Sequence, residues 1–149
     1  MVSKGRKYNY EAMFLLSQAQ AADLGAAVEH LKEVIKHAGA ELLAMKKWDE
    51  RRLAYEVDKQ KRGTYILSYF ASDPVNVASI ERSCNLSERI LRTLITRCDH
   101  LTLDQIKATD GQQDLATEAE LRRGRAAAAE STGSTTTVTA APAATTATA

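Results

Sequence analysis

The sequence predicts an α+β fold of the ferredoxin-like type, in which a four-stranded antiparallel sheet carries two helices on one face. Three observations lead to this fold class. Residues 53–57 alternate apolar and other side chains with the period of a strand. Residues 24–38 carry apolar side chains at spacings of four and three, which indicates one face of a helix. The predicted segments follow the order β-α-β-β-α-β, which is the element order of that fold.

The first two elements are a buried strand and an amphipathic helix. Residues 8–16 are predicted to form the strand, and because residues 12–16 are nearly all apolar, both faces should be covered. Residues 23–38 are predicted to form the helix, and Gly39 stands just past its last apolar position, where a helix commonly ends. The apolar stripe of this helix consists of Leu24, Val28, Leu31, Ile35 and Ala38.

The next two elements are predicted to form a hairpin. Residues 40–58 read as a long strand whose alternation falters at residues 48–51, which indicates a bulge or bend. Residues 59–63 form a polar, positively charged turn ending in Gly63, and residues 64–71 form the third strand. The hairpin should therefore carry positive charge both at its base and at its tip.

A second helix and a fourth strand complete the predicted domain. Asp73 and Pro74 provide an N-cap acid and a first-turn proline, and Asn85 stands where the helix could be capped at its end. Residues 89–97 are predicted to form the last strand, and the first and third strands, which are the most apolar, should take the centre of the sheet. No predicted element remains to cover the other sheet face, although it carries apolar residues. An uncovered apolar face predicts a partner.

The chain of 149 residues is predicted to divide into a domain at residues 1–100 and a C-terminal extension at residues 101–149. Leu101, Leu103 and Ile106 could pack back on the domain. Residues 116–125 could form a short helix with an ion pair between Glu118 and Arg122. From residue 126 the chain is almost entirely Ala, Thr and Ser, a composition that predicts disorder.

Composition and motifs argue against an enzyme. The three histidines and two cysteines have no metal-ligand spacing, so no metal or other cofactor is expected, and the cysteines are expected to be reduced thiols. The phosphate-cradling loop of acylphosphatases, which share the fold, is missing after the first strand. No signal peptide or membrane span is visible. The three histidines are His30, His37 and His100, and the two cysteines are Cys84 and Cys98.

Basic residues suggest a nucleic-acid partner, although residues 1–100 carry a net charge of only +3. The predicted strand order separates the basic residues into two zones. Arg51, Arg52 and Arg92 are the strongest candidates for RNA contacts, because arginine suits bidentate phosphate contacts. Base stacking, as in RNA recognition motifs, is the lesser RNA hypothesis, because only Arg62-Gly63 and Tyr69 match that signature. The expected RNA-binding residues are Lys4, Arg6, Lys7, Lys46, Lys47, Arg51, Arg52, Arg92 and Arg97.

The segment Trp48–Lys59, followed by Gly63-Thr64-Tyr65, resembles the W-x-x-R-x-L-A-Y-x-I/V-x-K…G-x-Y signature of the bacterial small-subunit ribosomal protein six family. The resemblance spans about residues 7–98 and includes Tyr10-Glu11 and the run at 89–92. It implies a structural protein of the cytoplasmic ribosome that binds the central domain of small-subunit ribosomal RNA as a heterodimer with small-subunit ribosomal protein eighteen. Asp49-Glu50 departs from the glycine and basic residue of many members, which weakens that position for RNA.

The partner is expected to contact aromatic side chains of the predicted strands, namely Trp48, Tyr55, Tyr65 and Tyr69. The alternative hypothesis is a non-ribosomal interaction or ligand-binding module of the same fold that self-associates through its open sheet face.

Overall fold

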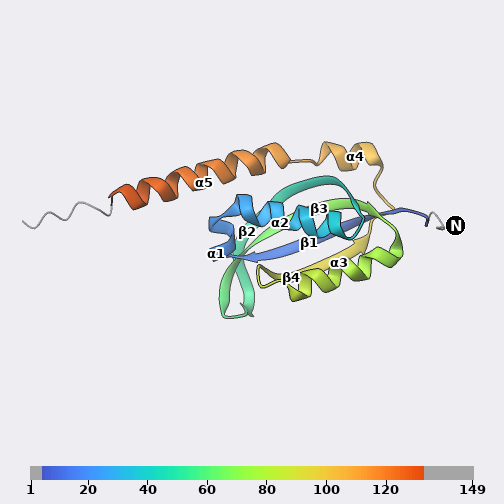
Figure 1. Ribbon diagram of the computed structural model, residues 1–149, viewed down its shortest axis with the longest axis horizontal. Coiled ribbons are helices and arrows are strands. Elements are labelled where there is room, and N and C mark those ends of the chain that lie inside the picture. Colours follow the sequence, from blue (N-terminus) through green and yellow to red (C-terminus); the bar gives the residue numbers. More distant parts are fainter. Residues whose placement is uncertain (1–4, 133–149) are drawn as a thin grey trace, which may run out of the picture.

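The computed structural model describes residues 5–132, and the structural statements below refer to this part of the chain. Its sheet has the strand order β2-β3-β1-β4 with antiparallel pairing throughout, which confirms the predicted fold, including the central position of the first and third strands (Figure 1). The elements are β1 (Tyr8–Ser17), α1 (Gln18–Ala22), α2 (Leu24–His37), β2 (Glu41–Val57), β3 (Gln60–Ser72), α3 (Pro74–Leu86), β4 (Ile90–Arg97), α4 (Leu103–Ala108) and α5 (Gln112–Thr132). The short helix α1 was not predicted.

The main core lies between the sheet and the helices α2 and α3. Phe14 of β1 and Ile66 of β3 are register partners, and both side chains are fully buried on this face. Leu31 contributes from the apolar stripe of α2, and Ile80 contributes from α3. Burying each such side chain stabilises the fold by about 1.5–3 kcal/mol. The alternation of β1 and β3 thus fixes which of their side chains face α2 and α3 and which face the other side.

The long edge strand β2 contains the predicted bulge. Its pairing with β3 shifts register between Lys47 and Asp49, within the segment where the alternation falters. Further shifts occur between Leu42 and Ala44 and between Arg52 and Val57. Bulges bend a strand and re-aim its side chains. The bulge between Lys47 and Asp49 allows Trp48 to reach Tyr65 on the side of the sheet that faces away from α2 and α3.

The turn of the β2–β3 hairpin is tighter than the sequence predicts. It consists of Asp58 and Lys59, whose φ values are 48° and 63°, so Val57 pairs directly with Gln60. Two-residue turns with both residues in the left-handed region match the twist of the flanking strands. Gly63 therefore belongs to β3 rather than to the turn. A Cβ atom there would collide with the side chain of Leu15, so close approach of the neighbouring strand explains this glycine.

The C-terminal extension crosses the edge of the sheet and contacts both faces. Helix α4 lies on the face opposite α2, where Ile106 is fully buried against Leu67 and Tyr69. Helix α5 runs along α2, where Leu115 joins the main core (Figure 1). The expectation that nothing in this chain covers the second face is therefore wrong for the part beneath α4. Leu103, also expected to pack back, is half exposed.

Helix α5 is longer than the sequence predicts. It continues through residues 126–132, for which the composition predicts disorder, because alanine has the highest intrinsic helix propensity. The predicted pair of Glu118 and Arg122 is confirmed within it. The remaining tail residues, 133–149, lie outside the described residues, so disorder there stays a prediction, as does the domain division at residue 100.

The link between α4 and α5 is tied to the outer edge of β2. The backbone N–H of Gly111 donates to the carbonyl of Met45 at 3.0 Å, and the backbone N–H of Met45 donates to Asp110 Oδ1 at 3.0 Å. These bonds satisfy groups that an edge strand would otherwise present to another chain. The crossing therefore closes the β2 edge at Met45.

Candidate protein and RNA interface

The sheet face opposite α2 and α3 is only partly covered, and a groove of about 260 Å³ opens on its free part. The groove lies between the β2–β3 hairpin and the strands β1 and β4. Leu94 and Tyr55 on its lining are 65% and 71% exposed, unusual values for large apolar side chains on a sheet. Its lining consists of Met13, Leu15, Leu53, Ala54, Tyr55, Val57, Tyr65, Arg92, Thr93 and Leu94.

Trp48 and Tyr65 form an aromatic pair next to this groove. Their ring centroids are 5.6 Å apart in an edge-to-face arrangement, and the Arg51 guanidinium lies 4.9 Å from the centre of the Trp48 ring. Arg51 also donates two hydrogen bonds to Asp49 Oδ2. The hydrogen bonds from Arg51, followed by one from the backbone of Glu50, lower the pKa of Asp49. Arg51 is therefore already paired with an acid and an aromatic ring, which limits its availability to RNA.

Three of the four aromatic residues expected to meet a partner are accessible from this face. Trp48 and Tyr55 are exposed, and Tyr65 is half-buried. Tyr69 differs, because α4 covers it and leaves 6% of it exposed. Burial, together with the nearby Glu11, raises the pKa of Tyr69 to about 12. The prediction of Tyr69 as an accessible contact conflicts with this packing, which also removes it from base stacking.

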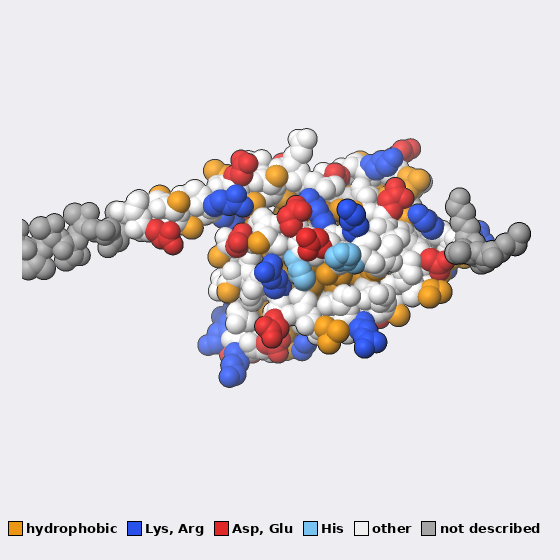
Figure 2. Space-filling view, in the orientation of Figure 1, with side chains coloured by type: hydrophobic (Ala, Val, Ile, Leu, Met, Phe, Trp, Pro, Cys, Tyr) orange, Lys and Arg blue, Asp and Glu red, His pale blue; other side chains and the backbone are white. Residues whose placement is uncertain are grey.

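The tip of the β2–β3 hairpin is the most basic part of this region. Residues 51–62 hold five Lys and Arg and two acidic residues, a net charge of +3, whereas the whole chain carries +1. Arg52 and Arg62 are register partners directly opposite each other, and neither forms an ion pair within residues 5–132. Figure 2 shows Lys and Arg side chains gathered at the lower left, over this hairpin.

A second basic zone lies at the opposite end of β1. Arg97 stacks on the Tyr8 ring at 3.7 Å from its centre and pairs with Asp99 at 2.7 Å, while Arg6 lies 5.6 Å from the same ring. Lys7 lies 3.9 Å from Glu41. Lys4 falls outside the described residues. The cations of this zone are thus largely held by acids and by one aromatic ring.

The remaining predicted cations are separated by the sheet. Arg92 lies on the free face as the register partner of Leu15 and lines the groove, and its guanidinium donates to the Leu91 carbonyl. Lys46 lies beside Gly111, where the extension crosses β2. Lys47 belongs to the opposite face, because it pairs with Ile66 of the main core. The nine candidates therefore do not form one surface.

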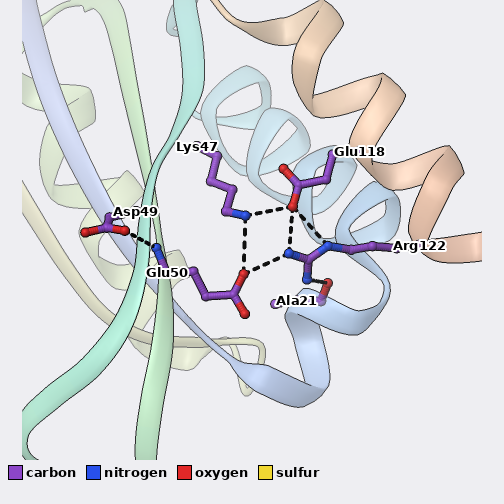
Figure 3. Close-up of polar contacts among 6 residues, drawn as sticks. All are labelled: Ala21, Lys47, Asp49, Glu50, Glu118 and Arg122. Atoms are coloured by element: carbon purple, nitrogen blue, oxygen red, sulfur yellow. Dashed lines mark hydrogen bonds and ion pairs between the residues drawn. The ribbon is translucent and has the colours of Figure 1, made fainter.

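Lys47 forms part of a four-residue charge network that holds α5 on the sheet (Figure 3). Its Nζ lies 2.7 Å from Glu118 and 3.2 Å from Glu50. Arg122 lies 2.6 Å from Glu118 and 2.8 Å from Glu50, and it also donates to the Ala21 carbonyl at 2.8 Å. All four charged side chains are more than two-thirds buried, so each ion pair is shielded from solvent better than an exposed one. The sequence predicts the ion pair of Glu118 and Arg122, but it does not predict their partners on β2, Lys47 and Glu50, which lie about 70 residues away.

The network predicts an acid-sensitive contact. The hydrogen bond from Arg122 is the largest cause that lowers the pKa of Glu50, and it outweighs burial. Burial raises the pKa of Glu118, but hydrogen bonds from Lys47 and Arg122 outweigh it, so this pKa is also lowered. Carboxyl groups with lowered pKa values stabilise the fold fully above the unfolded-state pKa of about 4.3, and this stabilisation is lost as the pH falls through the lowered values.

Arg122→Met is therefore expected to lower the free energy of unfolding by about 1–2 kcal/mol at pH 7. Below pH 4.3 the free energy of unfolding of the variant should fall less steeply with decreasing pH than that of the original protein. Urea unfolding at pH 7 and pH 3 measures both effects. Arg123→Met is the matched control, because Arg123 is exposed and forms no ion pair among the described residues. Equal pH dependence in the two variants would show that the network does not hold α5.

Two kinds of feature are absent from the described residues. Within residues 5–132, no three or more His, Cys, Asp or Glu side chains are grouped closely enough to hold a metal ion. No helix in the same range has the length and apolar character needed to cross a membrane.

The chain is similar to known proteins of one family. The family model described as Ribosomal protein S6 matches residues 9–97. Small ribosomal subunit protein bS6 of Desulforamulus reducens is 36% identical over 90 residues, covering 60% of this chain and 95% of the relative. The bS6 protein of Rhodopirellula baltica is 35% identical over 100 residues, covering 66% and 71%. The crystal structure of 30S ribosomal protein S6 from Thermotoga maritima matches the fold with a TM-score of 0.53 at 24% identity, covering 62% of this chain and 89% of that one.

Proposed function

Because the chain belongs to the ribosomal protein S6 family, we propose that it binds the central domain of small-subunit ribosomal RNA as a heterodimer with small-subunit ribosomal protein eighteen. Family membership makes it a component of the small ribosomal subunit and a structural protein rather than an enzyme. The RNA contact and the identity of the protein partner are the proposed parts. Each is supported by a separate feature of the sheet.

The placement of Arg52 opposite Arg62 is the observation that carries the RNA contact. Like charges directly opposite each other on neighbouring strands destabilise a sheet. No acid pairs with either guanidinium within the described residues, so the hairpin has unbalanced charge that an external anion would neutralise. Arginine donors in this arrangement fit phosphate oxygens. The RNA backbone supplies that anion.

The apolar groove on the free face supports the protein partner. Leu94, Tyr55 and Trp48 expose large apolar surfaces there, and apolar or aromatic anchors of this kind form the centre of protein interfaces. The groove lies next to the basic hairpin, since Tyr55 belongs to both. A protein that fills the groove would therefore lie beside the RNA contacted by the hairpin, and the two partners would bind together.

Arg52→Ala combined with Arg62→Ala is expected to weaken binding to the RNA–partner complex by about tenfold at low salt. It should also reduce the slope of log affinity against log salt by about two units, one for each phosphate contact. The fold should be unchanged or slightly more stable, because a repulsive cross-strand pair is removed. Filter binding at several potassium concentrations and urea unfolding measure the two effects.

The matched control is Arg82→Ala, an exposed arginine on α3, which should leave the salt slope unchanged. A slope that is the same for the hairpin variant and the original protein would refute Arg52 and Arg62 as phosphate contacts.

A further inference from the structure

We propose that the distal half of α5, residues 121–132, is a second RNA-contacting arm that continues the basic surface of the β2–β3 hairpin. The arm lies outside residues 9–97, which the family model matches. The inference rests on the proposed RNA binding and adds a contact that belongs to the C-terminal extension. Its partner is the phosphate backbone of RNA rather than a protein.

The arm is exposed and has almost nothing of its own to pack against. Within residues 121–131 only Arg122 is partly buried, and the one large apolar side chain, Leu121, is 67% exposed. In Figure 1 the arm extends past the end of the sheet, at the same end of the long axis as the hairpin. The arm therefore buries almost no apolar surface within the described residues.

The charge of the arm matches that of the hairpin. Residues 121–132 hold three arginines and one acid, a net charge of +2, next to the +3 of residues 51–62. The combined net charge of these two segments exceeds the +1 of the whole chain, so the rest of the chain has a net negative charge. Arg122 is taken up by the charge network, whereas Arg123 and Arg125 are exposed and form no ion pair within the described residues. A polyanion would favour this end of the molecule over the others.

The arm is held in a defined direction. Arg122 joins it to Glu50, the residue that precedes the basic hairpin segment, and to the Ala21 carbonyl on α1. An open depression of about 560 Å³ lies between the arm and β2, lined in part by Glu50, Arg122 and Arg125. The two acids at this depression, Glu50 and Glu118, are both neutralised by Lys47 and Arg122 (Figure 3). Its acidic lining is therefore neutralised, and the free Arg125 belongs to the same lining, whereas Arg123 lies on the side of the arm that faces Gly25 of α2.

The test compares variants for binding to a complex of central-domain ribosomal RNA transcript and protein eighteen. Arg123→Ala with Arg125→Ala should weaken binding three- to tenfold at low salt and reduce the log–log salt slope by about one to two units. Arg123→Lys with Arg125→Lys should restore the slope, because charge is retained. Circular dichroism of each variant shows whether the helix is intact.

The outcomes separate this inference from the proposed function. A reduced slope for the arm variant, with no change for Arg82→Ala, supports the arm. An unchanged slope for the arm variant, while Arg52→Ala with Arg62→Ala reduces it, overturns the arm and leaves the proposed function standing. Unchanged slopes for both overturn both contacts. An equal reduction for Arg82→Ala would show an unspecific charge effect and also overturn the arm.

Discussion

Ile106→Ala is expected to lower the free energy of unfolding by about 2–4 kcal/mol, although Ile106 lies in a six-residue helix outside the matched family domain. The Ile106 side chain is fully buried in a small cluster with Leu67, Tyr69 and Cys98. Truncation removes buried apolar atoms and leaves a cavity that a helix held by a capping box at Thr102 can fill only by shifting as a unit. The measurement is urea unfolding followed by circular dichroism.

Leu103→Ala on the same helix is the matched control, since Leu103 is 50% exposed and should cost less than about 1 kcal/mol. If the two variants were equally stable, α4 would not be docked on the sheet in solution. The free sheet face would then be larger than the structure shows, and Tyr69 would be accessible to a partner.

The spacing of apolar side chains was sufficient to predict the sheet and its two main helices. The predicted strands contain Phe14 and Ile66, which the structure places on the helix-covered face, and the faltering alternation at residues 48–51 marks the bulge. Gly63 was misread as a turn glycine, because a glycine needed for close strand approach looks the same in sequence as one needed for a left-handed turn. The difference emerges only when Leu15 is placed beside it.

The extension could be predicted only in part, for a physical reason. Helix α4 buries one large side chain fully, Ile106, and a single apolar residue has no periodicity to read. The pair of Glu118 and Arg122 could be predicted because four residues span about one helical turn. Their contact with Glu50 depends on how the C-terminal extension crosses the edge of β2 between α4 and α5, which no local pattern encodes. The burial of Tyr69 follows from the same crossing.

Leu94→Arg is expected to weaken the binding of protein eighteen by at least thirtyfold without changing the fold. Leu94 is 65% exposed and lies in the apolar groove, so arginine is tolerated in the free protein. When a partner fills the groove, the new charge would lose water and meet no acid among the groove-lining residues. Titration calorimetry with purified protein eighteen measures the loss.

Leu86→Arg is the control with the same substitution, because Leu86 is 75% exposed at the end of α3 and does not line the groove. Both variants raise the net charge by one, so direct phosphate contacts should be strengthened slightly rather than weakened. A loss confined to Leu94→Arg must therefore come from the protein contact. Equal affinities for the two variants would contradict the groove as the site where the partner binds.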